Sequence, residues 1–440
     1  MDPSTALTAP PRRLVLCLDG TWNSPFDQKV REDGRPVLKP TNVLKLCRAI
    51  LPVDPASGRS QVVYYDVGVG SLGDYPGVSN ALLERTDKAL GGAFGAGFEA
   101  NMEQALHFIA LNYQPGDEVL IFGFSRGAAT ARAVTTFLDW YGGVPAKSDH
   151  YFLAKAFRAW VTGKGKTDAG AVKARFATEL ATDGRPPLSP VIPVTVSFLG
   201  VWDTVAALGS RLKATGEETS TKKAFYFHDR PSRCVAHARH ALAVDEARFD
   251  FRPSIWRDAH PGQTMKQRWF PGVHSNIGGG YPEDGLANVA LHWMVDEAKA
   301  TSDLALDDDF LDRYRGFAFA RLHRSESALY RVLDAARLRV GRGRRALVGH
   351  PPTANLEIAK EVAWRLLADP EERRASGKPV HEQMVGHPPY RPRAVLQYLA
   401  CQPDAKAALA AILDKPAAEL TLPAGLEAEI AKLRGNCAPG

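Results

Sequence analysis

The sequence predicts an α/β fold, with a mostly parallel β-sheet that carries helices on both faces. Short apolar, β-branched runs alternate along the chain with longer amphipathic segments, and this alternation is typical of parallel sheets covered by helices. With 440 residues and 45% hydrophobic content, the chain can bury a sizeable core. The predicted strands are residues 14–18, 61–65, 119–122, 191–201 and 265–270, and the predicted helices are residues 42–51, 98–112 and 128–141.

The most informative motif follows the third predicted strand. Gly123-Phe124-Ser125-Arg126-Gly127 lies between the apolar run 119–122 and a helix that begins with small residues. The order strand, G-x-S-x-G, helix is that of the nucleophile elbow of an α/β-hydrolase, a turn so tight that small residues must flank the serine. G-x-S-x-G alone arises by chance in a glycine-rich chain, but the flanking strand and helix favour Ser125 as a nucleophile and an α/β-hydrolase-type sheet.

Two further residues are predicted to activate Ser125. A serine hydroxyl needs a base to remove its proton and an acid to orient that base, and in this fold the acid and then the base follow the serine along the chain. His274 follows a strand and opens a glycine-rich loop, which favours it as the base over a structural loop histidine. Asp203 ends the strand 191–201 and is the predicted acid, because triad acids come from strand ends. Asp245 is the alternative acid.

An oxyanion hole needs two N–H donors near the nucleophile. The backbone N–H of Arg126, directly after Ser125, is the first predicted donor. The second is expected from the loop after the first strand, at Gly20 or Thr21, because glycine lets the backbone approach closely. Asp19 is expected to support this loop through hydrogen bonds.

The chain is predicted to contain one large catalytic domain and an extension. Residues 1–11 are expected to be a disordered lead, and residues 12–300 the catalytic domain. Two long connections, 145–190 and 204–262, are read as cap-like insertions over the site. The strand signal fades after about residue 300, so residues 301–440 are predicted to form a mostly helical extension that packs on the core.

The positive charge is concentrated in one short segment. The chain has a net charge of +6, and residues 331–345 hold six arginines and one aspartate, a net charge of +5. Such a patch could contact anionic lipid head groups or nucleic acid, or it could be a solvated helix end. The segment lacks aromatic interleaving and any recognisable nucleic-acid module, so no nucleic acid is expected as a partner. The predicted lipid-surface patch comprises Arg337, Arg339, Arg342, Arg344 and Arg345.

Composition also limits cofactors and location. No cysteine pair has C-x-x-C spacing, which argues against a zinc knuckle, and neither a metal nor another cofactor is expected. No apolar run approaches the roughly 20 residues that span a bilayer, and the N-terminus lacks a signal-peptide pattern. A cytoplasmic protein is the default expectation, with secretion independent of a signal peptide as the alternative. The oligomeric state is not predicted.

Four motifs together resemble one known family, and a fifth segment, His381 with Tyr390-Arg391-Pro392, looks like its closing segment. The chain is similar to the α/β-hydrolase family that includes the type VI secretion phospholipase effectors and many bacterial and fungal relatives. One departure is Asn276, where the family usually has an aspartate. The motifs are Leu18-Asp19-Gly20-Thr21-Trp22-Asn23, Gly123-Phe124-Ser125-Arg126-Gly127-Ala128, Gly200-Val201-Trp202-Asp203-Thr204-Val205 and residues 269–281.

The resemblance implies serine-dependent hydrolysis of carboxylic esters, with phospholipids as one substrate class. The leading hypothesis is therefore a lipolytic serine hydrolase, of the phospholipase A or esterase type, acting on an acyl ester. One alternative is a catalytically inactive hydrolase fold that serves as a binding module. The other is a nucleic-acid-binding protein that uses the arginines of 331–345.

Overall fold

The computed structural model describes residues 10–20, 28–30, 36–68, 93–205, 226, 228–248, 251–323, 345–368 and 389–434. Several sequence predictions lie outside these residues. They include most of the predicted lead 1–11, much of the connection 204–262, Thr21, His381, and four members of the predicted lipid patch: Arg337, Arg339, Arg342 and Arg344.

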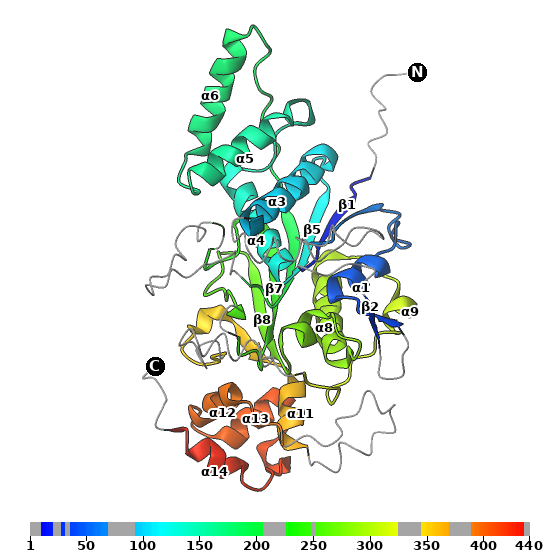
Figure 1. Cartoon of the computed structure of the whole chain (residues 1–440), viewed down its shortest axis with the longest axis vertical. Helices are drawn as coiled ribbons and strands as arrows, with labels where there is room; N and C mark the ends of the chain where they lie inside the picture. The colour runs from blue at the N-terminus through cyan, green and yellow to red at the C-terminus, as the bar shows by residue number, and fades with distance from the viewer. Residues whose placement is uncertain are drawn as a thin grey trace.

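The described residues form a parallel sheet of seven strands in the order β4-β1-β5-β6-β7-β8-β9 (Figure 1). The predicted α/β fold with a mostly parallel sheet is confirmed, and each of the five predicted strands overlaps an observed one. A separate antiparallel pair joins β2 (Gln28–Val30) to β3 (Pro36–Leu38). The sheet strands are β1 (Arg13–Leu18), β4 (Gln61–Asp66), β5 (Glu118–Phe124), β6 (Val196–Trp202), β7 (Val235–Ala243), β8 (Thr264–Phe270) and β9 (Leu356–Ile358).

Strand β7 corrects the prediction that residues 204–262 form only an insertion. It lies between β6 and β8 and is buried along most of its length. Its histidines and arginine hid the strand in the sequence, because a central strand is expected to be a continuous apolar run. Two of these side chains have partners inside the protein: Arg239 pairs with Glu297 at 2.6 Å, and His240 Nε2 accepts a hydrogen bond from the backbone N–H of Thr204 at 3.1 Å.

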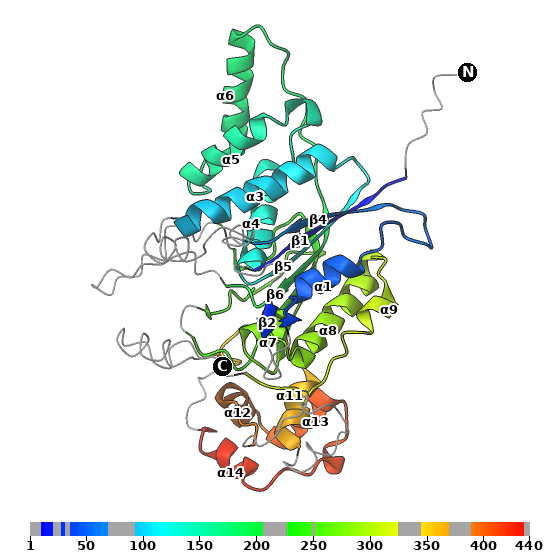
Figure 2. The same cartoon turned by 45° about the vertical axis from the view of Figure 1, so that its right-hand side comes forward.

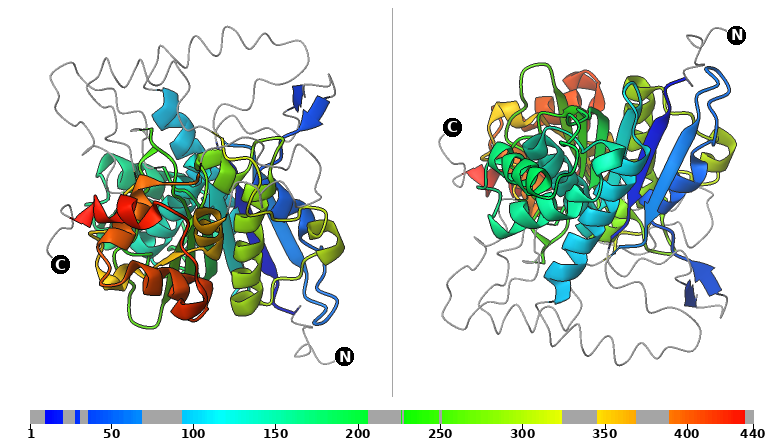
Figure 3. Two further views of the ribbon diagram at one scale, coloured as in Figure 1. Left: turned by 90° about the horizontal axis from the view of Figure 1, so that it is seen from below. Right: turned by 90° about the horizontal axis from the view of Figure 1, so that it is seen from above.

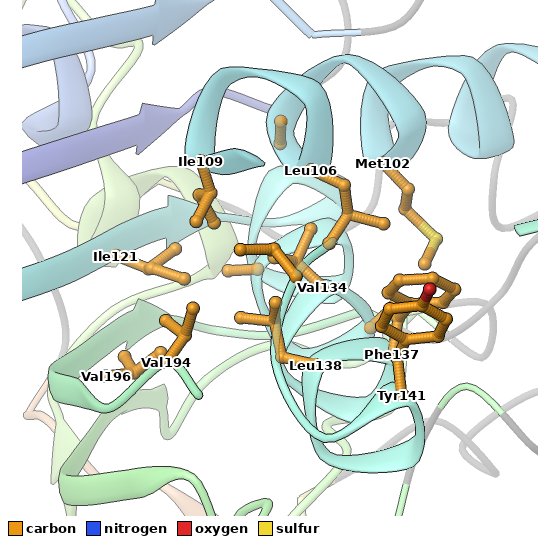
Figure 4. Packing of buried hydrophobic residues seen from close by; sticks show 14 of the residues in the cluster. Met102, Leu106, Ile109, Ile121, Val134, Phe137, Leu138, Tyr141, Val194 and Val196 are labelled. Carbon is orange, nitrogen blue, oxygen red and sulfur yellow. The ribbon is translucent and has the colours of Figure 1, made fainter. Parts of the chain in front are cut away.

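Helices cover both faces of the sheet, as Figure 3 shows from two sides. Side chains alternate between the faces along β1, because successive residues of a strand point in opposite directions: Leu14 and Leu16 belong to one apolar cluster, and Val15 and Cys17 to another. The first cluster lies under α3 (Ala93–Asn112) and α4 (Arg126–Tyr141) and is drawn in Figure 4; the second lies under α1 (Asn42–Ala49), α8 (Gly285–Ser302) and α9 (Asp308–Leu311).

The connection 145–190 does not form the predicted cap over Ser125. It contains the short 3-10 turn η1 (Lys147–Asp149) and the helices α5 (Phe152–Thr162) and α6 (Ala169–Thr182). It leaves from the C-terminal end of α4 and returns to the N-terminal end of β6, and Val144 and Ile192 bridge its base. Ser125 precedes the other end of α4, so α5 and α6 extend from the opposite edge of the sheet (Figures 1 and 2).

The C-terminal part of the described chain is mostly helical, as predicted. It has an apolar cluster of its own, which continues onto the sheet through Leu242 of β7 and Trp269 of β8. One short strand, β9, extends the sheet beside β8. Helix α8 crosses the predicted boundary at residue 300, and that boundary stays a prediction. The elements are η5 (Pro352–Ala354), α11 (Lys360–Leu367), α12 (Arg393–Ala400), α13 (Ala405–Leu413), η7 (Ala417–Glu419) and α14 (Leu426–Ala431).

Two glycines permit the turn between β5 and α4. A Cβ atom at Gly123 would lie 2.6 Å from the carbonyl oxygen of Gly127, and a Cβ atom at Gly127 would lie 2.1 Å from the carbonyl oxygen of Leu18. Both distances are far below van der Waals contact, and backbone atoms stand on the other side. The glycines therefore let α4 begin directly beside the C-terminal end of β1.

We predict that Gly127→Ala destabilises the protein, because neither the turn nor β1 can yield to the added methyl group. Overpacking a well-packed interior costs about 1–3 kcal/mol, and a backbone contact places this site at the upper end or beyond. Chemical denaturation of wild type and variant measures the difference. The matched control is Gly170→Ala on the exposed first turn of α6, where an added Cβ would meet only a side-chain oxygen of Asp168, at 3.0 Å; equal losses in both variants would contradict the steric argument.

Asp19 connects three elements at the C-terminal end of β1. Its carboxylate accepts hydrogen bonds from the backbone N–H of Gly20 at 2.7 Å, from Thr41 Oγ1 at 2.5 Å and from the Tyr65 hydroxyl at 2.9 Å. Thr41 caps the N-terminus of α1, and Tyr65 belongs to β4. Burial raises the pKa of Asp19 to about 7, although the three hydrogen bonds act in the opposite direction.

The raised pKa of Asp19 predicts a pH-dependent stability. An unfolded aspartate titrates near about pH 4, so between about pH 4 and 7 the folded state holds one more proton than the unfolded state. The free energy of unfolding should therefore fall as pH rises through this window, by up to about 1.4 kcal/mol per pH unit. Asp19→Asn should remove this contribution, whereas Asp183→Asn at an exposed site controls for the substitution itself. An unchanged slope in Asp19→Asn, measured by denaturation between pH 4 and 7, would refute the prediction.

Candidate active site

Ser125 lies in a strained turn between β5 and α4. Its φ of 58° and ψ of −118° are unusual for a residue with a side chain, and backbone strain of this kind is found at functional sites. The surrounding chain holds the turn, because the N–H of Ser125 donates to the carbonyl of Trp202 at 3.0 Å and its own carbonyl accepts from Ala129 at 3.2 Å. This is the local geometry of a nucleophile elbow.

His274 reaches Ser125 from the end of β8. It is the first residue of α7 (His274–Gly278), and its Nε2 lies 2.8 Å from Ser125 Oγ. The ring is buried against Phe124 and Phe251, with centroid distances of 4.6 and 4.9 Å. The backbone N–H of His274 donates to the carboxylate of Glu246 at 3.2 Å. Packing and this backbone hydrogen bond therefore fix the ring beside the serine.

Asp203 lies on the other side of the His274 ring. It follows β6 with a positive φ of 39° and is fully buried. Its Oδ2 is 2.7 Å from His274 Nδ1, and its Oδ1 accepts from the backbone N–H of Ala243 at 3.1 Å. In a neutral imidazole with the proton on Nδ1, His274 donates to Asp203 and leaves Nε2 as an acceptor for the serine hydroxyl. The three side chains thus form one hydrogen-bonded chain.

Arg345 completes the surroundings of Asp203. Its Nη2 lies 3.1 Å from Oδ1 and 2.8 Å from Oδ2 of Asp203, and both side chains are fully buried. Burial by itself raises the pKa of Asp203, but the Arg345 charge and the hydrogen bonds from His274 and Ala243 lower it to about 2. Asp203 is therefore ionised at neutral pH.

This position corrects the assignment of Arg345 to the lipid-surface patch. The sequence grouped it with its arginine neighbours, and a run of like charges usually lies in water. A buried carboxylate changes the balance, because an uncompensated charge inside a protein is costly. The Arg345 guanidinium offsets part of that cost through Nη2, although its Nε and Nη1 are buried without a hydrogen-bond partner among the described residues. Arg345 is thus directed inward and cannot contact a membrane surface.

The alternative acid, Asp245, has other partners. Its carboxylate accepts hydrogen bonds from the backbone N–H of Gly272 at 2.7 Å and from the Tyr390 hydroxyl at 2.9 Å. Burial raises its pKa to about 6. Within the described residues its hydrogen bonds hold the loop that precedes His274, and the contact with the His274 ring is made by Asp203.

Of the predicted oxyanion donors, Arg126 lies beside Ser125, and Gly20 has another hydrogen-bond partner. Arg126 is the first residue of α4, so its N–H lies at the positive end of a helix beside Ser125. The N–H of Gly20 already donates to Asp19 at 2.7 Å, which differs from its expected role as a donor to substrate. Asp19 makes the supporting hydrogen bonds expected of it.

The sequence missed the contributions of Arg345, Glu246 and Tyr390. Arg345 lies 142 residues after Asp203, and no local pattern connects the two. Glu246 adjoins Asp245, which the sequence did single out. Phe251 was also missed, since one aromatic residue in a loop carries no signal of its contact with the His274 ring.

The described residues contain neither a membrane-spanning helix nor a cluster of metal ligands. None of the helices in the ranges given above combines the length and the apolar character that a bilayer crossing requires. Across those ranges, no three histidine, cysteine, aspartate or glutamate side chains are grouped so that they could hold a metal ion.

Two uncharacterized proteins match this chain over part of their length. A curated protein of Saccharomyces cerevisiae, the uncharacterized protein YEL023C, is 25% identical over 245 residues, which is 55% of this chain and 32% of that protein. An uncharacterized protein from Pseudomonas aeruginosa has a solved structure that matches 98% of this chain and 63% of its own, with 18% identity and a TM-score of 0.40. This chain therefore spans about a third of the yeast protein and under two thirds of the bacterial one.

The family of this chain is shown by a family model, and one further solved structure is similar to part of it. The structure of the Tle1 effector bound to the VgrG spike from the type VI secretion system matches 62% of this chain and 52% of that one, with 20% identity and a TM-score of 0.31. The family model described as "T6SS, Phospholipase effector Tle1-like, catalytic domain" matches residues 12–297, which include Ser125, Asp203 and His274. The chain therefore belongs to the family of Tle1-like phospholipase effectors of the type VI secretion system, through its catalytic domain.

Proposed function

We propose that this protein is a serine hydrolase that cleaves the acyl ester bonds of phospholipids or related lipids. The observation that carries the proposal is the hydrogen-bonded chain from Ser125 Oγ through the His274 ring to Asp203, with distances of 2.8 and 2.7 Å. Membership of a phospholipase effector family supports the lipid substrate. The strained backbone at Ser125 supports its role as the nucleophile.

In the proposed mechanism, Ser125 Oγ attacks the carbonyl carbon of the ester while His274 Nε2 takes the serine proton. Asp203 stabilises the imidazolium that forms. The negative charge on the carbonyl oxygen develops near the N-terminus of α4, where the N–H of Arg126 favours it. His274 then gives the proton to the departing alcohol, and an acyl-serine remains. Water, deprotonated by His274, cleaves that ester and releases the fatty acid and free Ser125.

The alternatives have less support. A catalytically inactive binding module would not need a serine, a histidine and an ionised aspartate in hydrogen-bond contact. A nucleic-acid role for 331–345 loses one of its arginines, because Arg345 is buried against Asp203. A peripheral contact with anionic membranes stays a prediction for Arg337, Arg339, Arg342 and Arg344. Membership of a secretion-effector family supports export without a signal peptide over permanent residence in the cytoplasm.

We expect Ser125→Ala to abolish lipid ester cleavage while the fold persists. Loss of a triad serine lowers kcat by a factor on the order of 10⁶. The measurement is mass spectrometry of fatty acids and lysolipids released from mixed phospholipid vesicles, with circular dichroism to check folding. Ser189→Ala, at an exposed serine, is the matched control. Turnover by Ser125→Ala close to that of the control would remove Ser125 as the nucleophile.

We expect Asp203→Asn and Asp245→Asn to differ sharply in kcat on a soluble ester. Losing the aspartate that orients the base costs on the order of 10⁴-fold, and His274→Ala should cost still more. Asp245→Asn removes a loop contact on Gly272 and Tyr390, so its effect should be far smaller. Steady-state kinetics of the three variants test the assignment. A greater loss in Asp245→Asn than in Asp203→Asn would exchange their roles.

A further inference from the structure

The carboxylate of Asp203 receives donors from widely separated parts of the chain. Oδ1 accepts from Ala243 N and from Arg345 Nη2, and Oδ2 accepts from His274 Nδ1 and again from Arg345 Nη2. Ala243 and His274 lie inside the region that matches the family's catalytic domain, which ends at residue 297. Arg345 lies outside that region, and its guanidinium supplies the positive charge beside Asp203.

A carboxylate without exposed surface cannot rely on water for its charge. Burial alone favours the protonated form, by several pKa units for a fully buried group. A protonated Asp203 would no longer stabilise an imidazolium at His274, and its loss of charge would weaken the preference for a proton on Nδ1. The ionised form therefore depends on the remaining donors, and Arg345 is the charged one among them.

Other charged groups near the site are engaged elsewhere. Glu246 accepts the backbone N–H of His274 and pairs with Arg248 at 2.8 Å. His240 is buried in β7, and burial together with the charge of Arg132 lowers its pKa to about 3, so it is neutral near pH 7. Arg132, on α4, donates to the carbonyls of Ser254 and His228. In the described part of the chain, Arg345 is the cation that contacts Asp203.

We propose that Arg345 is a positioning residue of this site, whose guanidinium keeps the buried Asp203 carboxylate ionised and oriented toward His274. The inference rests on the proposed function for its role in hydrolysis. The proposed effect of Arg345 on the charge state of the Asp203–His274 pair can be measured without a substrate.

The charge of Arg345 also opposes an extra proton on that pair. The two side chains titrate together, so the protons belong to the pair rather than to either residue. Removing the cation should make the pair hold its proton to a higher pH. An opposite charge in contact shifts a carboxyl group by roughly 1–3 pKa units, so we expect the titration midpoint of the pair to rise by about one pH unit or more in Arg345→Gln.

The experiment is an NMR titration of the full-length protein labelled at histidine Cε1. Loss of one signal in His274→Gln assigns the His274 ring. We expect the midpoint to rise in Arg345→Gln and to stay near the wild-type value in Arg345→Lys, which retains the charge. The matched control is Arg239→Gln, since Arg239 is an equally buried arginine that pairs with Glu297 instead. A midpoint in Arg345→Gln equal to that in wild type would overturn the proposal, as would an equal rise in Arg345→Lys.

A second measurement needs no variant at Arg345, in case Arg345→Gln does not fold. Wild-type protein labelled at the aspartate carboxyl carbon reports Asp203 directly, with Asp203→Asn for assignment. We expect the Asp203 signal to remain that of the ionised form down to pH 4. A signal that moves between pH 4 and 7 to the position of a protonated carboxylic acid would overturn the proposal, whereas a smaller change that follows the His274 titration would not.

Kinetics separate this inference from the proposed function. On a soluble ester, the acidic limb of the kcat/KM profile should move upward in Arg345→Gln by the same amount as the NMR midpoint, with no such movement in Arg239→Gln. If wild type and Ser125→Ala were equally inactive on every ester, the proposed function would fail, and the NMR titrations would still decide the role of Arg345. A moved NMR midpoint with an unmoved kinetic limb in an active enzyme would overturn the catalytic part of the inference.

Discussion

A fully buried negative charge is the constraint on which the arrangement of the site depends. Asp203 has no exposed surface, so its charge depends on groups of the protein, and each of these groups must be held in a fixed position beside the carboxylate. The backbone of Ala243 is held there by the register of β7, His274 by the loop after β8, and Arg345 by a segment far along the chain. Because an unpaired charge inside a protein is costly, the ionised Asp203 favours conformations in which these three segments are docked together.

The parallel sheet explains how residues from three strands meet. Ser125 and Asp203 follow neighbouring strands, β5 and β6, whereas His274 follows β8, with β7 in between. The loop after β8 must therefore cross the end of β7 to reach Ser125. Residues at the end of β7 hold it there: the carboxylate of Asp245 accepts from Gly272 N, and that of Glu246 accepts from His274 N. Asp245, the alternative acid of the sequence analysis, thus helps to hold the loop that carries His274.

Sequence patterns captured the parts of this structure that depend on local chemistry. Apolar runs marked β1, β4, β5, β6 and β8, and glycine spacing marked the turn at Ser125, because each is encoded by neighbouring residues. Strand β7 was missed because its Arg239 and His240 find partners only in the folded core. The cap was misplaced although the predicted order, helix 128–141 and then strand 191–201, already puts the connection 145–190 at the N-terminal edge of a parallel sheet, whereas Ser125 lies at the C-terminal edge. Arg345 was misread because its inward direction is set by a carboxylate 142 residues away.

Some contacts with the candidate site come from residues beyond the region that matches the family's catalytic domain. The family's catalytic domain matches residues 12–297, and this region contains Ser125, Asp203 and His274. Two contacts from beyond it nevertheless reach the site: Arg345 on Asp203, and Tyr390 on Asp245, which holds the loop before His274. A carboxylate buried without its arginine would favour protonation, and a loop without its tyrosine would lose one restraint. The electrostatics of the candidate site therefore extend past the matched domain, because Arg345 and Tyr390 of the C-terminal part contact its buried carboxylates.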